Sequence, residues 1–94
     1  MKYLLRSSYI IAVKTIIFTL RAAKELDALP EQARAAIDRA LGDYAISGRG
    51  DVKSLKGKEG YRMRVGSYRV LFDVDKTTVL AISVGRRVTT TYRK

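Results

Sequence analysis

The stretch YRMRVGSYRVLF, from Tyr61 to Phe72, constrains the fold of this chain more than any other. Gly66-Ser67 is typical of a two-residue hairpin turn, because glycine adopts a positive φ without steric cost. A hairpin closed there pairs Arg64 with Arg69. Successive side chains of a strand point to opposite faces, so one face of this hairpin is apolar and must be buried. That face carries Tyr61, Met63, Val65, Tyr68, Val70 and Phe72.

The opposite face of the hairpin is rich in arginine. It carries Arg62, Arg64 and Arg69, with Leu71 beside them. Like charges directly opposite each other destabilise a sheet, so a purely structural hairpin gains nothing from placing Arg64 against Arg69. Guanidinium groups bind phosphate oxygens in pairs, and a phosphate-binding surface needs such a cluster. The hairpin therefore predicts an anion-binding face.

The charge of the chain points to the same kind of partner. The 94 residues suit one small domain, and the formal net charge is +10. Residues 1–47 carry a net +2 and residues 48–94 a net +8. This bias toward the hairpin half favours a polyanion such as nucleic acid. The alternatives are a solvated basic surface and a basic surface masked by an acidic protein.

Cysteine and histidine are both absent from the sequence. There is thus no disulfide, no thiol nucleophile and no imidazole for acid–base catalysis or metal binding. We expect no metal and no cofactor, so any catalysis must use arginine, lysine, tyrosine or carboxylate groups. A chain without cysteine fits a cytoplasmic location.

Residues 1–13 are expected to be an N-terminal extension to a single domain formed by residues 14–94. Their apolar run is too short for a secretory leader or a membrane span. A translation start misassigned upstream is one interpretation, and an extra edge strand or a frayed tail is the other.

The remainder of the chain predicts an N-terminal strand, two helices and further strands. The β-branched run at residues 15–19 indicates a strand buried on both faces. Thr19 is expected to cap a helix with an apolar stripe at Leu20, Ala23 and Leu26, and Pro30 to begin a second, antiparallel helix. Short strands are expected around residues 52–55 and 78–84.

The last of these strands should pair with the hairpin. Pairing Val74 with Thr78 places Leu80, Ile82 and Val84 on the buried face. Ser83 then lies opposite Arg69. If the strand continues, Arg87 shares the arginine face.

A basic turn, Lys56-Gly57-Lys58, precedes the hairpin. The Walker spacing GxxxxGK[ST] is absent and no helix opens after this turn, which disfavours a nucleotide site. We interpret the lysines as contacts to a nucleic-acid backbone. Lys56, Lys58 and Arg86 form the expected RNA-binding set.

Over about residues 14–92, the sequence resembles the RelE/ParE superfamily of bacterial type II toxins, on the RelE side. The segments that carry the resemblance are AAKELDALP, LKGKEGYRMRVGSYRVLF, AISVGRR and a tyrosine near the C-terminus. The resemblance implies an α+β fold in which an αα hairpin packs on a curved antiparallel sheet. It also implies a toxin that enters the ribosomal A site and cleaves mRNA, unless a cognate antitoxin wraps it.

The resemblance also implies catalytic residues. Arg62 and Arg64 stand where the family pattern has two lysines, and arginine is much harder to deprotonate. Arg69 matches an arginine that holds the scissile phosphate, and Arg87 matches one on the leaving-group side. Tyr92 is nearest to a tyrosine that stacks on a base and assists proton transfer, although it lies one residue closer to the arginine. Two alternatives stay open: a ParE-like gyrase inhibitor, and a toxin that binds antitoxin without cleaving.

Overall fold

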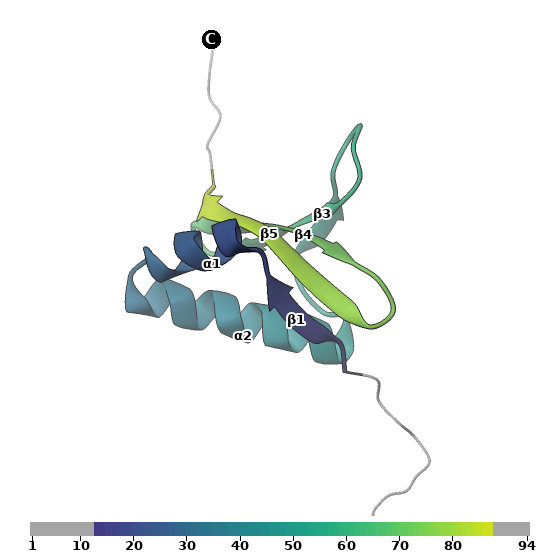
Figure 1. Ribbon diagram of the computed structural model, residues 1–94, viewed down its shortest axis with the longest axis horizontal. Helices are drawn as coiled ribbons and strands as arrows, with labels where there is room; N and C mark the ends of the chain where they lie inside the picture. The colour runs from purple at the N-terminus through teal and green to yellow at the C-terminus, as the bar shows by residue number, and fades with distance from the viewer. Residues whose placement is uncertain (1–12, 88–94) are drawn as a thin grey trace, which may run out of the picture.

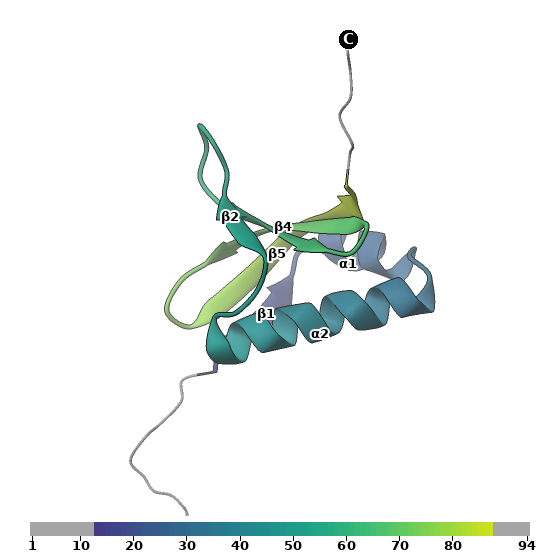
Figure 2. The same ribbon diagram turned by 180° about the vertical axis from the view of Figure 1, so that it is seen from behind.

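The computed structural model describes residues 13–87, which form two helices packed against one face of a five-stranded sheet (Figures 1 and 2). The elements are β1 (Thr15–Phe18), α1 (Leu20–Asp27), α2 (Glu31–Ser47), β2 (Val52–Ser54), β3 (Tyr61–Val65), β4 (Tyr68–Val74) and β5 (Thr78–Arg86). The strand order is β1-β5-β4-β3-β2; β1 is parallel to β5 and the other neighbours are antiparallel. The predicted α+β class is confirmed.

The helices begin and end at residues suited to those positions. The hydroxyl of Thr19 accepts a hydrogen bond from the backbone N–H of Ala22 (3.1 Å), which confirms the predicted cap of α1. Pro30 is the N-cap of α2, and Glu31 lies in the first turn near the positive end of the helix dipole. Gly48, with a φ of 76°, ends α2 in the left-handed conformation that favours glycine.

The core lies between the helices and the sheet. Its largest fully buried side chains are Phe72, Ile37, Leu41, Met63, Val70 and Val79. The ring of Phe72 meets Tyr44 edge-on at 5.3 Å between centroids and stacks with Tyr61 at 5.7 Å. The predicted hairpin register is confirmed, because Tyr61 pairs with Phe72 and Arg64 with Arg69. The apolar face of the hairpin is therefore the face that the helices cover.

Two burial predictions for the N-terminal segment are wrong. Ile17 is 47% exposed and Leu20 is 73% exposed. The helices cover only one face of the sheet, so the residues of β1 alternate in exposure instead of being buried on both sides. In α1, Ala22 and Leu26 face the core, which turns Leu20 outward.

The predicted register between β4 and β5 is also wrong. Phe72 pairs with Ala81 and Leu71 with Ser83, so a β-bulge leaves Ile82 without a partner in β4. The buried residues of β5 are consequently Val79, Ala81 and Val84, and the side chain of Ile82 is 37% exposed. Gly85, not Ser83, lies opposite Arg69.

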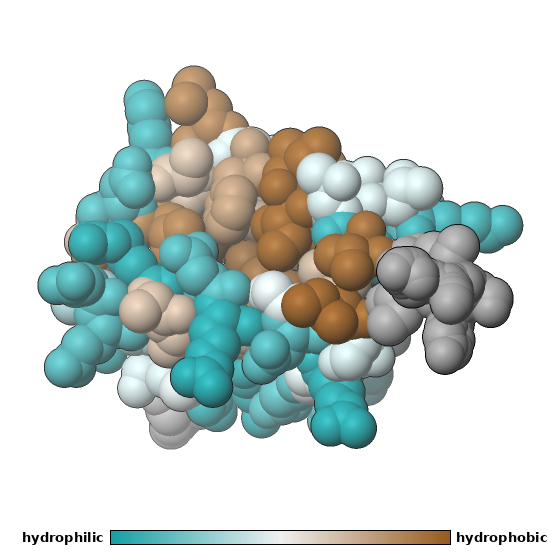
Figure 3. Space-filling model, turned by 90° about the horizontal axis from the view of Figure 1, so that it is seen from below, coloured by the Kyte–Doolittle hydropathy of each residue, from teal (hydrophilic) through white to brown (hydrophobic). Residues whose placement is uncertain are grey.

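An apolar surface remains outside the core. Figure 3, seen from below, shows apolar side chains gathered in a band across the middle of the molecule. Among the described residues, the exposed large hydrophobic side chains are Val13, Ile17, Leu20, Ile46 and Ile82.

No helix within residues 13–87 is long and apolar enough to cross a membrane. The expected N-terminal extension (apart from Val13) and Tyr92 lie outside the described residues.

Candidate nucleic-acid interface

The face of the sheet that the helices leave uncovered, here called the open face, carries three of the predicted arginines. Arg64 and Arg69 pair directly across β3 and β4. Arg62 pairs with Leu71 two residues farther along the strands, on the same face. Directly opposite residues in a sheet have Cβ atoms about 5 Å apart, so two guanidinium groups can reach one phosphate from this row. We call Arg62, Arg64 and Arg69 the arginine face.

The structure adds Lys53 to this surface. Lys53 pairs with Arg62 across β2 and β3, so it shares the open face, and it is exposed. The sequence predicted a strand here but not its partner. The sequence did contain a signal for the face of Lys53, because the apolar Val52, which is half-buried, alternates with the charged Lys53.

Arg87 lies beside the same hairpin turn. Its backbone N–H donates to the carbonyl of Ser67 (2.8 Å), and its Nη1 donates to the carbonyl of Gly66 (3.0 Å). Ser83 and Gly85 pair with Leu71 and Arg69 on the open face, and Arg87 continues this alternation. The structure therefore brings Arg87 to the end of the arginine face nearest Arg64 and Arg69.

The expected RNA-binding residues are placed elsewhere. Arg86 pairs with Tyr68, and its guanidinium carbon lies 5.4 Å from the centre of the Tyr68 ring, on the side of the helices. Lys56 and Lys58 are exposed in the loop before β3, at the end of that strand away from the Gly66 turn. The five residues of β3 span about 14 Å between these two ends. These three side chains thus lie outside the arginine face.

The arginine face is free of carboxylate partners within the described part of the chain. Across residues 13–87 the one ion pair joins Arg21 and Glu25 on α1 (3.2 Å). Two carboxylates lie beside the arginine face without an ion pair to it. Asp51 stands across from Arg64, whose backbone N–H donates to the Asp51 carbonyl (3.0 Å), and Asp73 is two residues along β4 from Leu71, the partner of Arg62. The positive charge of this face is therefore available to an external anion.

Residues able to transfer protons are scarce on the open face. Of the described tyrosines, Tyr61 and Tyr68 share the face of Phe72 and Val65, toward the helices, and Tyr44 lies on α2. Burial raises the pKa of Tyr44, which keeps its hydroxyl protonated. Within residues 13–87 no group of three or more acidic side chains is arranged to hold a metal ion.

Two carboxylates with lowered pKa accept hydrogen bonds from the backbone of β5 and of the turn before it. The backbone N–H of Val84 donates to Glu25 (2.8 Å) and lowers the pKa of that carboxyl. The backbone N–H groups of Thr77 and Thr78 donate to Asp75 (2.9 and 2.8 Å) in the turn before β5 and lower its pKa. Both acids are thus structural, and neither lies on the arginine face.

A helix pair on one side of a mixed sheet and a basic open face on the other form the architecture that the resemblance to RelE/ParE toxins implies. A family model described as the ParE toxin of the type II toxin-antitoxin system, parDE, matches residues 16–89. The chain belongs to this family within the RelE/ParE superfamily, which confirms the resemblance found in the sequence. A comparison with curated proteins finds no match.

Solved structures of RelE toxins share the fold. The RelBE2 toxin–antitoxin complex of Mycobacterium tuberculosis contains a chain 32% identical, with a TM-score of 0.69, over 79% of this chain and 98% of that one. For the intact RelBE complex of E. coli the values are 28%, 0.67, 81% and 99%. The isolated RelE toxin of E. coli gives 26% identity, a TM-score of 0.68, and coverage of 82% and 87%.

Proposed function

We propose that this type II toxin is a metal-independent endoribonuclease that cleaves mRNA in the ribosomal A site and so blocks translation. The observation that carries the proposal is the arginine face, extended by Lys53 and Arg87 and free of carboxylate partners within the described residues. Five cations on one exposed surface can bind successive phosphates of a single strand. Similarity to RelE toxins also supports the proposal of mRNA cleavage.

The chemistry requires alignment and charge stabilisation more than a protein nucleophile. The 2′-OH of the RNA attacks the adjacent phosphorus, the 5′-oxygen leaves, and a cyclic phosphate remains. Guanidinium groups from Arg64 and Arg69 can hold the equatorial oxygens, where negative charge grows in the transition state. We assign Arg87, beside the turn, to the leaving oxygen.

Few groups are available to transfer protons in this reaction. Arg62 and Arg64 bind anions strongly but give up a proton poorly, so they serve as electrostatic contacts. Tyr92, outside the described residues, is the proposed group that stacks on a base and moves a proton. The ribosome supplies the geometry of the mRNA, which accounts for much of the rate. We therefore expect poor cleavage of naked RNA and efficient cleavage of translated mRNA.

A cognate antitoxin is the expected partner. Solved relatives of this chain are RelB–RelE complexes, which supports such an assembly. The exposed apolar side chains, including Leu20 and Ile46, offer area that a partner helix can bury. A second segment of the antitoxin would shield the arginine face. A toxin that acts on ribosomes would act in the cytoplasm, which is the location that we propose.

The second candidate is a ParE-like inhibitor of DNA gyrase that performs no hydrolysis. The matching family model is that of a ParE toxin, and arginines occupy the two lysine positions of the RelE pattern. The same fold serves both activities, so the fold does not choose between them. A toxin that binds antitoxin but no longer cleaves is the third alternative.

Primer extension after induction separates these candidates. Wild-type toxin should leave breaks at codon positions in translated mRNA, and Arg69→Ala should reduce them by about 100-fold. Arg39→Ala, at an exposed arginine of α2, is the matched control and should cleave like wild type. DNA damage signalling without mRNA breaks would support gyrase inhibition instead.

A further inference from the structure

The bulge in β5 determines which of two adjacent arginines reaches the open face. Ala81 and Val84 both face the core, although an even alternation would place residues three apart on opposite faces. Ile82 is the extra residue that resets the alternation. If β5 kept Ile82 in a regular ladder with no bulge, Arg86 would share the face of Arg69 and Arg87 would turn toward the helices.

The bulge leaves polar groups of β5 that no strand can satisfy. The pairing of β1 with β5 ends at Phe18 and Ala81, so β5 has no strand on that side from Ile82 onward. Unpaired backbone groups at a half-buried position are costly. The bulge therefore needs partners from another element.

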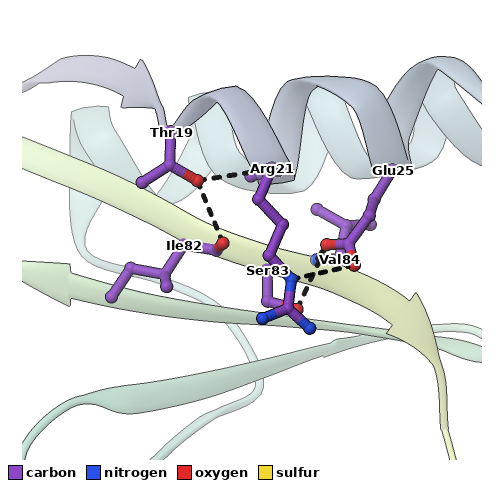
Figure 4. A network of polar contacts seen from close by, with 7 residues as sticks. Thr19, Arg21, Glu25, Ile82, Ser83 and Val84 are labelled. Atoms are coloured by element: carbon purple, nitrogen blue, oxygen red, sulfur yellow. Dashed lines mark hydrogen bonds and ion pairs between the residues drawn. The ribbon is translucent and has the colours of Figure 1, made fainter.

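Helix α1 supplies these partners (Figure 4). The hydroxyl of Thr19 donates to the carbonyl of Ile82 (3.0 Å). The Oε1 of Glu25 accepts from the backbone N–H of Val84 (2.8 Å) and from the hydroxyl of Ser83 (3.2 Å). Three consecutive residues of the bulged segment are thus bonded to two side chains that lie six residues apart on the chain.

We propose that Glu25, together with Thr19, is a positioning residue that holds the β5 bulge and thereby places Arg87 at the arginine face. The effect reaches Arg87 through the backbone, because Glu25 contacts Ser83 and Val84 while Arg87 is anchored to Gly66 and Ser67. The placement of Arg87 is a structural statement. Its effect on cleavage rests on the proposed function.

The contacts of Glu25 separate this role from that of a surface ion pair. Its other oxygen, Oε2, bonds to Arg21, whose side chain is 72% exposed. An exposed pair of this kind contributes little, so Arg21→Ala should leave the bulge intact. Glu25→Gln keeps an oxygen that can accept from Val84, and it serves as the conservative variant.

Amide hydrogen exchange tests the structural statement without any assay of cleavage. Glu25→Ala should speed exchange of the Val84 and Arg87 amides by tenfold or more, while the core amide of Val70 changes little. Arg21→Ala should leave all three within about twofold of wild type, and Glu25→Gln should lie close to wild type. Unchanged exchange at Arg87 in Glu25→Ala would overturn the proposal.

Cleavage of ribosome-bound mRNA tests the functional consequence. Displacing a catalytic group by about 1 Å costs up to 100-fold, and a loss of this order is expected for Glu25→Ala. Because Glu25 acts through Arg87, the double variant with Arg87→Ala should be no slower than Arg87→Ala alone. Losses that multiply would contradict a positioning role. If wild type does not cleave, the proposed function fails while the exchange result still stands.

Deletion of Ile82 provides a rescue that a general loss of stability would not show. The deletion removes the extra residue, so a regular ladder would keep Val84 buried and Arg87 on the open face. Combined with Glu25→Ala, it should restore protection of Arg87 and most of the cleavage. Should Glu25→Ala fail to fold alone, a folded combination supports the proposal. A combination that stays unfolded, or folds with Arg87 unprotected, overturns it.

Discussion

The salt dependence of RNA binding gives a quantitative test of the open face. Five cations gather there: Lys53, Arg62, Arg64, Arg69 and Arg87. Arg64, Arg69 and Arg87 share one phosphate in the proposed mechanism, so with Arg62 and Lys53 the face contacts three phosphates. Each phosphate contact to a single strand contributes about −0.7 to the slope of log K against log salt, so wild type should show a slope near −2.1. Affinity should then fall about 20-fold between 50 and 200 mM KCl. Fluorescence anisotropy with a short 2′-O-methyl RNA, which cannot be cleaved, measures this slope.

Single substitutions then distinguish the open face from the net charge of +10. Arg62→Ala removes one phosphate contact and should change the slope to about −1.4. Arg39→Ala removes the same charge from α2 and should leave the slope near −2.1. Equal slopes for Arg62→Ala and wild type, or equal reductions for the two variants, would refute the assignment of binding to this face.

Three further predictions concern the frame that supports the face. Phe72→Ala should lower the free energy of unfolding by about 3–5 kcal/mol in urea titrations, because the ring is 1% exposed between Tyr44 and Tyr61; a loss below 1 kcal/mol would contradict the packing. Gly66→Ala should cost about 1–2 kcal/mol, since the φ of 59° is strained for alanine although no atom lies within 4 Å of the added Cβ. Glu25 and Asp75 have lowered pKa values in the fold, so the stability they contribute is present above about pH 4.5 and is lost as the pH falls through their folded pKa values. Denaturant titrations from pH 7 to pH 2.5 should show this loss, and Glu25→Gln should reduce it; a pH profile that this variant leaves unchanged would contradict the role of Glu25.

The hairpin was predictable because its own residues fix its register. A two-residue turn at Gly66 leaves one pairing, and the alternation on both sides agrees with it. The arginine pair therefore followed from sequence. The β5 register did not, because residues 79 to 82 are all apolar and both registers bury apolar side chains. Contacts with segments distant in sequence, namely β1, Thr19 and Glu25, determine the register of β5.

The same reasoning explains the outcome at the site. Lys53 escaped prediction because six loop residues separate β2 from β3 and leave their register open. Arg86 and Arg87 are neighbours in sequence and face opposite sides, and only the bulge determines which of them reaches the open face. Leu20 fitted an apolar stripe, yet the hydrogen bonds of Thr19 orient α1 so that Ala22 packs inward. Tertiary contacts overrode the local pattern in each case.

The most direct measurement is a crystal structure of the toxin bound to a 2′-O-methyl RNA trinucleotide. The account predicts one phosphate within hydrogen-bond distance of the guanidinium groups of both Arg64 and Arg69, with Arg87 beside the 5′-oxygen. A phosphate held instead on the helix side, near Arg86, or an open face with no RNA at saturating concentration, would contradict it.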